Sequence, residues 1–139
     1  MNTPMTIQAT SFSRDDSFAQ ANVCAQEDSL DPKLLETVRL RVAQLCNCQL
    51  CIDYHTEILK AHGESNDRIK QLNVWRESSL YEARERAALA LTEALGSDPL
   101  EPVPHNLVQD AQDYFNDADI LQLTITIFAV RDSNYLCLH

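Results

Sequence analysis

The chain has 139 residues, of which 45% are apolar, 23% are charged and 6% are aromatic, and this is the composition of one soluble globular domain. Its 11 basic and 21 acidic side chains give a formal net charge of −10, which repels nucleic-acid phosphates and anionic membrane surfaces. No apolar run approaches the roughly 20 residues that span a bilayer. We therefore expect no nucleic-acid and no membrane partner, and the lack of a secretory signal pattern predicts a cytoplasmic location.

Residues 1–27 are polar and predict an N-terminal arm with room for one short helix near residues 18–24, ahead of one helical domain over residues 28–139. Asp31 and Pro32 supply a cap and a proline at the first helical position, and apolar residues recur behind them at three- and four-residue spacing. This pattern predicts one amphipathic helix. Similar signals predict helices over residues 48–62, 65–73, 82–95 and 104–115, and a last helix capped by Asp117.

The chain has two glycines, Gly63 and Gly96, and each follows a predicted helix where a left-handed C-terminal cap is expected. Residues 121–127 are ambiguous, because apolar and polar residues alternate as in a strand although the helical spacing is equally regular. No second strand pattern offers a partner, and a lone strand is unstable. We assign these residues to the last helix, so the predicted fold is all-α with about six to seven helices.

Three of the five cysteines, Cys46, Cys48 and Cys51, lie close together. If the segment is helical, Cys48, Cys51 and His55 occupy positions i, i+3 and i+7 on one face. The N–H groups and the positive dipole end at the start of a helix stabilise a thiolate, and a histidine one turn after Cys51 can accept its proton. Such a trio can attack a peroxide, pass through a sulfenic acid and close to a disulfide.

The same segment is compatible with other chemistry. A zinc site could use Cys46, Cys48, Cys51 and His55, but structural zinc sites draw two ligands from a second knuckle that the sequence lacks. The cysteines could instead be small core residues. A thioredoxin-like oxidoreductase would need βαβ surroundings. We therefore expect no metal and no cofactor, and we expect redox chemistry at the cysteine pair.

Four blocks, residues 30–45, 48–55, 75–77 and 82–94, together resemble the carboxymuconolactone decarboxylase-like family, in its alkylhydroperoxidase AhpD-like branch. The resemblance implies an all-α fold that assembles as a homo-oligomer (dimer, trimer or hexamer). It also implies a thiol-dependent peroxidase that reduces hydroperoxides and is regenerated by a dithiol, lipoyl or thioredoxin-type reductant. The decarboxylase branch lacks the cysteine pair, so the pair favours redox chemistry.

By the same resemblance, Cys51 is the thiol that attacks the peroxide, Cys48 resolves it, and His55 and Glu36 form a proton relay. Glu36 precedes Cys48 by twelve residues, and on one straight helix this spacing would separate them by about 18 Å along the axis. The chain must therefore turn near Asn47, and asparagine tolerates the left-handed conformation of such a turn.

Two other functions fit the same residues: a redox-sensing or disulfide-exchange protein on this scaffold, and a non-redox enzyme of the lactone decarboxylase type. Cys46 is either an alternative resolving thiol or a core residue. The charged residues between positions 82 and 86 are typical of a solvated helix face, and residues 75–77 indicate packing with an ion pair.

Overall fold

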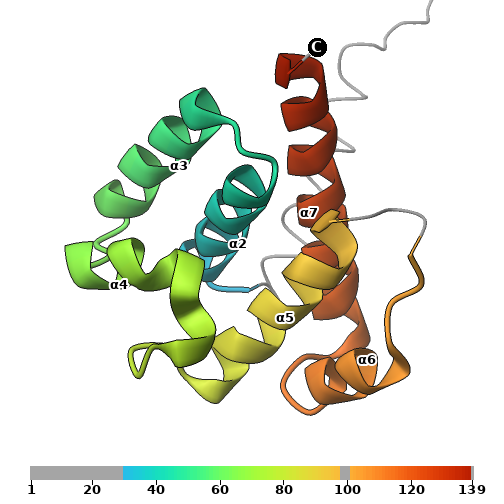
Figure 1. Cartoon of the computed structure of the whole chain (residues 1–139). Helices are drawn as coiled ribbons and strands as arrows, with labels where there is room; N and C mark the ends of the chain where they lie inside the picture. Colours follow the sequence, from blue (N-terminus) through green and yellow to red (C-terminus); the bar gives the residue numbers. More distant parts are fainter. Residues whose placement is uncertain (1–29, 98–100, 139) are drawn as a thin grey trace, which may run out of the picture. The chain divides into compact units, whose positions relative to one another are not determined.

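The computed structural model of the chain is built from helices joined by short loops (Figure 1). It describes residues 30–97 and 101–138, with side chains as far as residue 133. The described helices are α2 (Pro32–Leu45), α3 (Gln49–Ala61), α4 (Asn66–Gln71), the 3-10 helix η2 (Leu72–Glu77), α5 (Ala83–Ser97), α6 (His105–Gln112) and α7 (Asp117–Leu138). No strand occurs in these described residues, so the all-α prediction is confirmed, and residues 121–127 are helical. The predicted arm over residues 1–27 and its short helix lie outside the described residues.

Helix α2 lies among α3, α5 and α7 and packs against all three (Figure 1). Val38 and Val42 follow the predicted apolar stripe, but Glu36, Thr37 and Leu40 are buried as well. The predicted amphipathic helix is therefore a central helix that is buried on more than one face. A charged side chain such as Glu36 can be buried there only if polar partners surround it.

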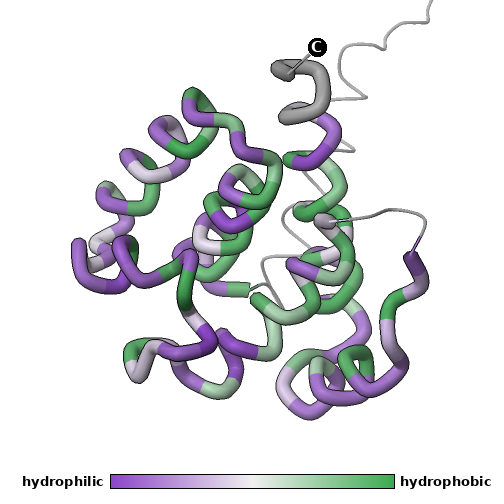
Figure 2. The backbone as a smooth tube through the Cα atoms, in the orientation of Figure 1, coloured by the Kyte–Doolittle hydropathy of each residue, from purple (hydrophilic) through white to green (hydrophobic). Residues whose placement is uncertain are grey.

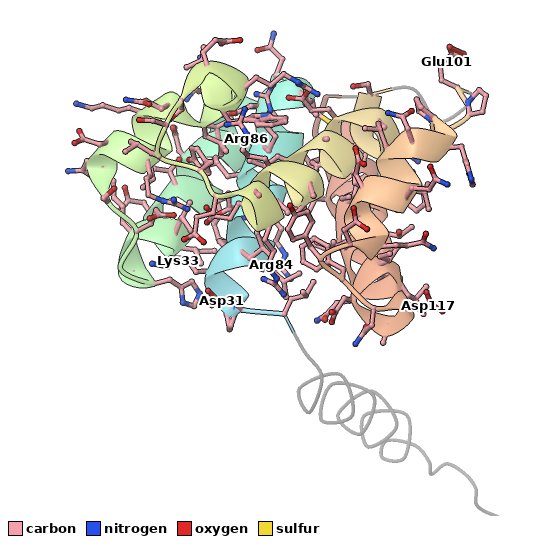
Figure 3. All side chains as sticks on the ribbon, turned by 90° about the horizontal axis from the view of Figure 1, so that it is seen from below. Asp31, Lys33, Arg84, Arg86, Glu101 and Asp117 are labelled. Atoms are coloured by element: carbon pink, nitrogen blue, oxygen red, sulfur yellow. The ribbon has the colours of Figure 1, made fainter. Side chains whose placement is uncertain are left out.

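Two of the predicted helix-end signals are confirmed. At the start of α2, Oδ1 of Asp31 accepts a hydrogen bond of 3.0 Å from the backbone N–H of Lys33 (Figure 3). After α3, Gly63 has a φ of 91°, the left-handed conformation that glycine adopts without strain. Both signals depend on local backbone geometry, and this explains why the sequence reveals them.

Two other end predictions are wrong. Gly96 is buried inside α5, which continues to Ser97, and its φ is not in the left-handed region. An added Cβ atom would meet Leu45 of α2 at 3.5 Å, an ordinary van der Waals contact, so Gly96 is a helix residue and not a cap. Helix α7 is capped by Asn116 and not by Asp117. Oδ1 of Asn116 accepts a hydrogen bond of 2.8 Å from the N–H of Asp119, and Oδ2 of Asp119 accepts one of 3.3 Å from the N–H of Asn116, a reciprocal cap.

Two arginines on different sides of α5 behave differently (Figure 3). Arg84 is exposed, and its guanidinium carbon lies 4.5 Å from the centre of the Phe115 ring. Arg86 donates hydrogen bonds to backbone carbonyl oxygens, including those of Trp75 at 2.9 Å and Ser78 at 3.1 Å. The predicted solvated face is therefore wrong for Arg86, which fixes the end of η2.

Helix α7 carries apolar residues along most of its described length (Figure 2). Leu123, Ile127 and Val130 are buried, whereas Leu121 and Ile125 are exposed. Within the part of the chain that the structure describes, no helix combines the length and the apolar character needed to cross a membrane. One face of α7 packs on α2 and α5, and its later turns supply one wall of the pocket described below.

Candidate active site

The chain reverses direction between α2 and α3. Asn47 has a φ of 60°, in the left-handed region. The backbone N–H groups of Asn47 and Cys48 donate hydrogen bonds to the carbonyl oxygens of Gln44 (3.1 Å) and Ala43 (3.2 Å). The turn predicted near Asn47 is therefore confirmed. It sets α3 beside α2 (Figure 1), so residues that a straight helix would keep apart become neighbours.

Glu36 is a buried carboxylate on α2, with 3% of its surface exposed. Its Oε1 accepts a hydrogen bond of 3.0 Å from Nη1 of Arg39, and its Oε2 lies 2.5 Å from Nδ1 of His55. Burial alone would raise the pKa of Glu36, but the hydrogen bonds and charges of His55 and Arg39 together outweigh burial and hold this pKa below its ordinary value. Glu36 is therefore a fixed negative charge.

His55 reaches from α3 to this carboxylate and is itself largely buried. Its ring packs edge-on against Tyr54, with 5.1 Å between the ring centres. A carboxylate can only accept hydrogen bonds, so Nδ1 of His55 carries a proton. The other ring nitrogen, Nε2, is then left to take up or release a second proton. Glu36 thus selects one tautomer and one orientation of the imidazole.

Cys48 and Cys51 belong to the start of α3. Cys48 is the N-cap, and its Sγ accepts a hydrogen bond of 3.3 Å from the backbone N–H of Cys51. The two Sγ atoms are 2.6 Å apart, so disulfide closure needs only a small movement. The positive end of the α3 dipole favours negative charge on these sulfurs. Cys48 is 4% exposed, whereas Cys51 is half-buried.

A pocket of about 520 Å³ opens beside Cys51, between α2, α3 and α7. Its described lining residues are Arg39, Leu50, Cys51, Tyr54, His55, Ala129, Val130 and Ser133. Leu50 and Tyr54 are strongly exposed for their size, at 72% and 64%. A mainly apolar pocket of this volume, with a few polar groups, is typical of sites for small organic molecules.

The facing sides of α2 and α3 bring together the four residues proposed from the sequence. Glu36 contacts His55, Cys48 contacts Cys51, and His55 and Cys51 line the same pocket. Cys46 is half-buried at the C-terminal cap of α2 and is not among the described lining residues. The residues that the structure describes include no group of three or more His, Cys, Asp or Glu side chains placed to hold a metal ion.

The sequence did not identify Arg39 as a site residue. On a predicted helix it resembles any exposed charge, although its position three residues after Glu36 allows the two side chains to meet on one face. In the structure it contacts Glu36 and lines the pocket. The arrangement can therefore deprotonate a thiol, expose it to a small electrophile and close a disulfide behind it.

A half-buried carboxylate, Glu93 of α5, lies in a different environment. Its Oε2 accepts hydrogen bonds from Nε and Nη2 of Arg41 (3.0 and 2.8 Å) and from Nε1 of Trp75 (2.9 Å), and its Oε1 pairs with Arg76. Burial alone would raise the pKa of Glu93, but these donors outweigh burial and lower it. The packing with an ion pair predicted for residues 75–77 is confirmed, and this carboxylate ties α2, η2 and α5 together.

Comparisons with known proteins agree with this architecture. The carboxymuconolactone decarboxylase family model matches residues 16–94. A solved structure from Agrobacterium tumefaciens, of a protein of unknown function that is a candidate antioxidant defence protein AhpD, is similar with a TM-score of 0.77 and 25% sequence identity. The similarity covers 94% of this chain and 89% of that chain.

Two relatives are similar in sequence. The uncharacterized protein YdfG of Bacillus subtilis (strain 168) is 29% identical over 109 residues, which cover 78% of this chain and 74% of YdfG. The uncharacterized protein YnjA of Escherichia coli (strain K12) is 34% identical over 70 residues, which cover 50% of this chain and 38% of YnjA.

Proposed function

Since this chain belongs to the carboxymuconolactone decarboxylase family, in its AhpD-like branch, we propose that it is a thiol peroxidase that reduces organic hydroperoxides. The observation that carries the proposal is the placement of Cys51. This thiol lines a pocket together with His55, and its Sγ atom lies 2.6 Å from Sγ of Cys48. A thiol that only filled the core would need neither the pocket nor the oriented imidazole.

In the first step, Nε2 of His55 takes the proton of Cys51, and Glu36 stabilises the imidazolium that forms. The Cys51 thiolate attacks one peroxide oxygen, and the O–O bond breaks. Cys51 becomes a sulfenic acid, and the leaving alkoxide takes the proton from His55 and departs as an alcohol. The pocket opening beside Cys51 supports this thiol as the attacking group, because Cys48 is 4% exposed.

In the second step, the Cys48 sulfur attacks the sulfenic acid, which forms the disulfide and releases water. A dithiol of lipoyl or thioredoxin type then attacks the more accessible sulfur, Cys51, and Cys48 leaves as a thiolate. The hydrogen bond from the Cys51 backbone N–H to Cys48 Sγ stabilises that charge, and a stabilised thiolate is a faster leaving group. The second thiol of the reductant attacks its own sulfur in this mixed disulfide, which releases Cys51 and leaves the reductant as a disulfide. The two cysteines thus have different tasks because of their positions in the first turn of α3.

The proposal is tested by steady-state turnover of cumene hydroperoxide with a dithiol as reductant. We expect turnover by the wild-type chain and a loss of at least about 10³-fold in Cys51→Ser, because this change removes the nucleophile. If Cys51→Ser turns over cumene hydroperoxide at the wild-type rate, the assignment is wrong.

Two variants serve as matched controls. Cys48→Ser should still consume one equivalent of hydroperoxide and accumulate the Cys51 sulfenic acid, which a sulfenic-acid-specific reagent such as dimedone traps. Cys46→Ser should keep wild-type turnover, because Cys46 does not line the described pocket. A Cys48→Ser variant with unimpaired multiple turnover would remove Cys48 from the mechanism.

A further inference from the structure

Arg39 brings a positive charge to the pocket beside Cys51. Among the described residues that line this pocket, it carries the only fixed charge. Nη1 of Arg39 donates to Oε1 of Glu36, and this is the single hydrogen bond that the Arg39 side chain makes with the described residues. A guanidinium has five N–H groups. Most of the donors of Arg39 therefore have no partner among the described residues, and 36% of its side chain is exposed.

Other arginines of the chain use their donors within the fold. Arg41 binds Glu93 through two nitrogens and donates to the side chain of Gln44 through the third. Arg86 donates three hydrogen bonds to backbone carbonyl oxygens. These side chains have structural partners in the described part of the chain. Arg39 has one hydrogen-bonding partner, and the pocket that it lines also contains Cys51 and His55. Arg76 likewise has one hydrogen-bonding partner, Glu93, but it lines a different pocket without a described thiol.

The rest of the pocket wall favours an apolar body. Leu50 and Tyr54 of α3 present exposed apolar surface, and Ala129 and Val130 of α7 line the pocket as well. Apolar surface of this kind binds hydrocarbon groups, whereas a guanidinium binds carboxylates through two parallel hydrogen bonds. The chain carries a net charge of −10, so it does not attract anions in general, and an anionic ligand needs a specific cation.

We infer that Arg39 selects the substrate, and that the preferred substrates are apolar hydroperoxides that carry a carboxylate a few carbon atoms from the peroxide group. This inference rests on the proposed function, and it names the substrate class of the same site. The short spacing follows from the geometry of Glu36. Nη1 of Arg39 and Nδ1 of His55 bind the two oxygens of this one carboxylate, so the guanidinium is close to the imidazole that serves the reacting thiol.

The test compares two substrates that differ only in charge: cumene hydroperoxide with a carboxylate in the para position, and the methyl ester of that acid. For the wild-type chain at low ionic strength, we expect kcat/KM to be about 10-fold higher for the acid than for the ester. Arg39→Gln should bring this ratio to about one, and Arg39→Lys should keep part of it, because lysine retains the charge but not the paired donors.

Arg84→Gln is the matched control, because Arg84 is an exposed arginine that lies over Phe115 and not in the described lining of the pocket. It should keep the wild-type ratio. If the wild-type ratio is already about one, or if Arg39→Gln lowers the rates for acid and ester equally, Arg39 only positions Glu36 and the inference is wrong.

A binding measurement separates this inference from the proposed function. We expect the reduced chain to bind 4-isopropylbenzoate, which has no peroxide group, at least about 10-fold more tightly than its methyl ester in calorimetric titrations, and Arg39→Gln to remove the difference. Selective binding without turnover of any hydroperoxide would overturn the peroxidase proposal and support the carboxylate site. Turnover of neutral cumene hydroperoxide without selective binding would overturn the carboxylate site alone.

Discussion

Glu36 and Glu93 are two carboxylates with similar electrostatics and different surroundings. Glu36 is buried and Glu93 is half-buried, both pair with arginine, and both have a pKa held below the ordinary value by their donors. The donors of Glu93 are two arginines and an indole, which keep their protons near neutral pH. One of the donors of Glu36 is His55, which can release a proton and take it back.

This difference separates a structural carboxylate from a candidate catalytic one. The lowered pKa is common to both and therefore does not identify the site. What distinguishes Glu36 is a partner that can exchange protons, placed beside a thiol in a pocket. The α2–α3 region and the α5–η2 region should therefore respond differently to substitution.

The largest expected effect comes from removing each charge in turn. Glu36→Gln should lower peroxide turnover by about 10²- to 10⁴-fold, because it disables proton transfer through His55. Glu93→Gln should lower the free energy of unfolding by about 2–4 kcal/mol, because a carboxylate with several charged donors is lost. Turnover per folded molecule should be unchanged in Glu93→Gln. Stopped-flow kinetics and urea denaturation of both variants measure these effects. Similar losses of turnover in Glu36→Gln and Glu93→Gln would show that the two carboxylates do not differ in role.

Trp75→Phe tests the α5–η2 region by a smaller change. It removes the 2.9 Å hydrogen bond from Nε1 to Glu93 while keeping an aromatic ring in a buried position. We expect the free energy of unfolding to fall by about 1–3 kcal/mol and the kinetics to stay as in wild type. A loss of turnover without a loss of stability would mean that the Glu93 cluster takes part in the reaction.

The pH dependence of stability should reveal both carboxylates. Their pKa values are lower in the folded chain than the ordinary value of 4.5, so below about pH 4.5 the unfolded chain binds more protons. Each pair therefore stabilises the fold fully above this pH, and its contribution is lost as the pH falls through the lowered pKa. The slope for one group is at most about 1.4 kcal/mol per pH unit. The free energy of unfolding, plotted against pH between neutral and acidic pH, should fall less steeply for Glu36→Gln and for Glu93→Gln than for the wild-type chain. Equal slopes in the variants and the wild type would contradict the lowered pKa values.

The smallest effect is expected at the turn that places the site. Asn47 has a φ of 60°, so Asn47→Ala should cost about 1 kcal/mol and Asn47→Gly much less. Because the turn sets Cys48 and His55 against α2, the alanine variant should also lose some turnover. Chemical denaturation and peroxide kinetics of the two variants measure this, and equal stability of all three chains would show that the turn does not depend on residue 47.

How much the sequence reveals depends on the range of the interaction. The cap at Asp31 and the left-handed Gly63 are set by a few neighbouring residues and were predictable from them. The turn at Asn47 was predicted because the family resemblance requires Glu36 to approach Cys48, and asparagine tolerates the left-handed conformation. Gly96 was misassigned because α5 continues through it to Ser97, and Arg86 was misassigned because the carbonyl groups that it binds belong to another part of the chain.

The residues of the candidate site also differ in whether their contacts lie within one helix or between helices. Cys48, Cys51 and His55 share one helix, so their spacing alone brings them to one face. Glu36 became a candidate only through the family resemblance, and its contact with His55 depends on how α2 and α3 pack. Arg39 was missed because the sequence does not show which helix charges face a pocket.

The most direct test of the account is mass spectrometry of the reduced chain after exposure to one equivalent of cumene hydroperoxide. We expect a loss of two hydrogen atoms, located in the single tryptic peptide that contains both Cys48 and Cys51 as an internal disulfide, and we expect Glu36→Gln to form this bond far more slowly. The proposed mechanism is contradicted if both cysteines remain thiols after exposure to the hydroperoxide. A thiol-specific alkylating reagent that still modifies them would show that they are accessible.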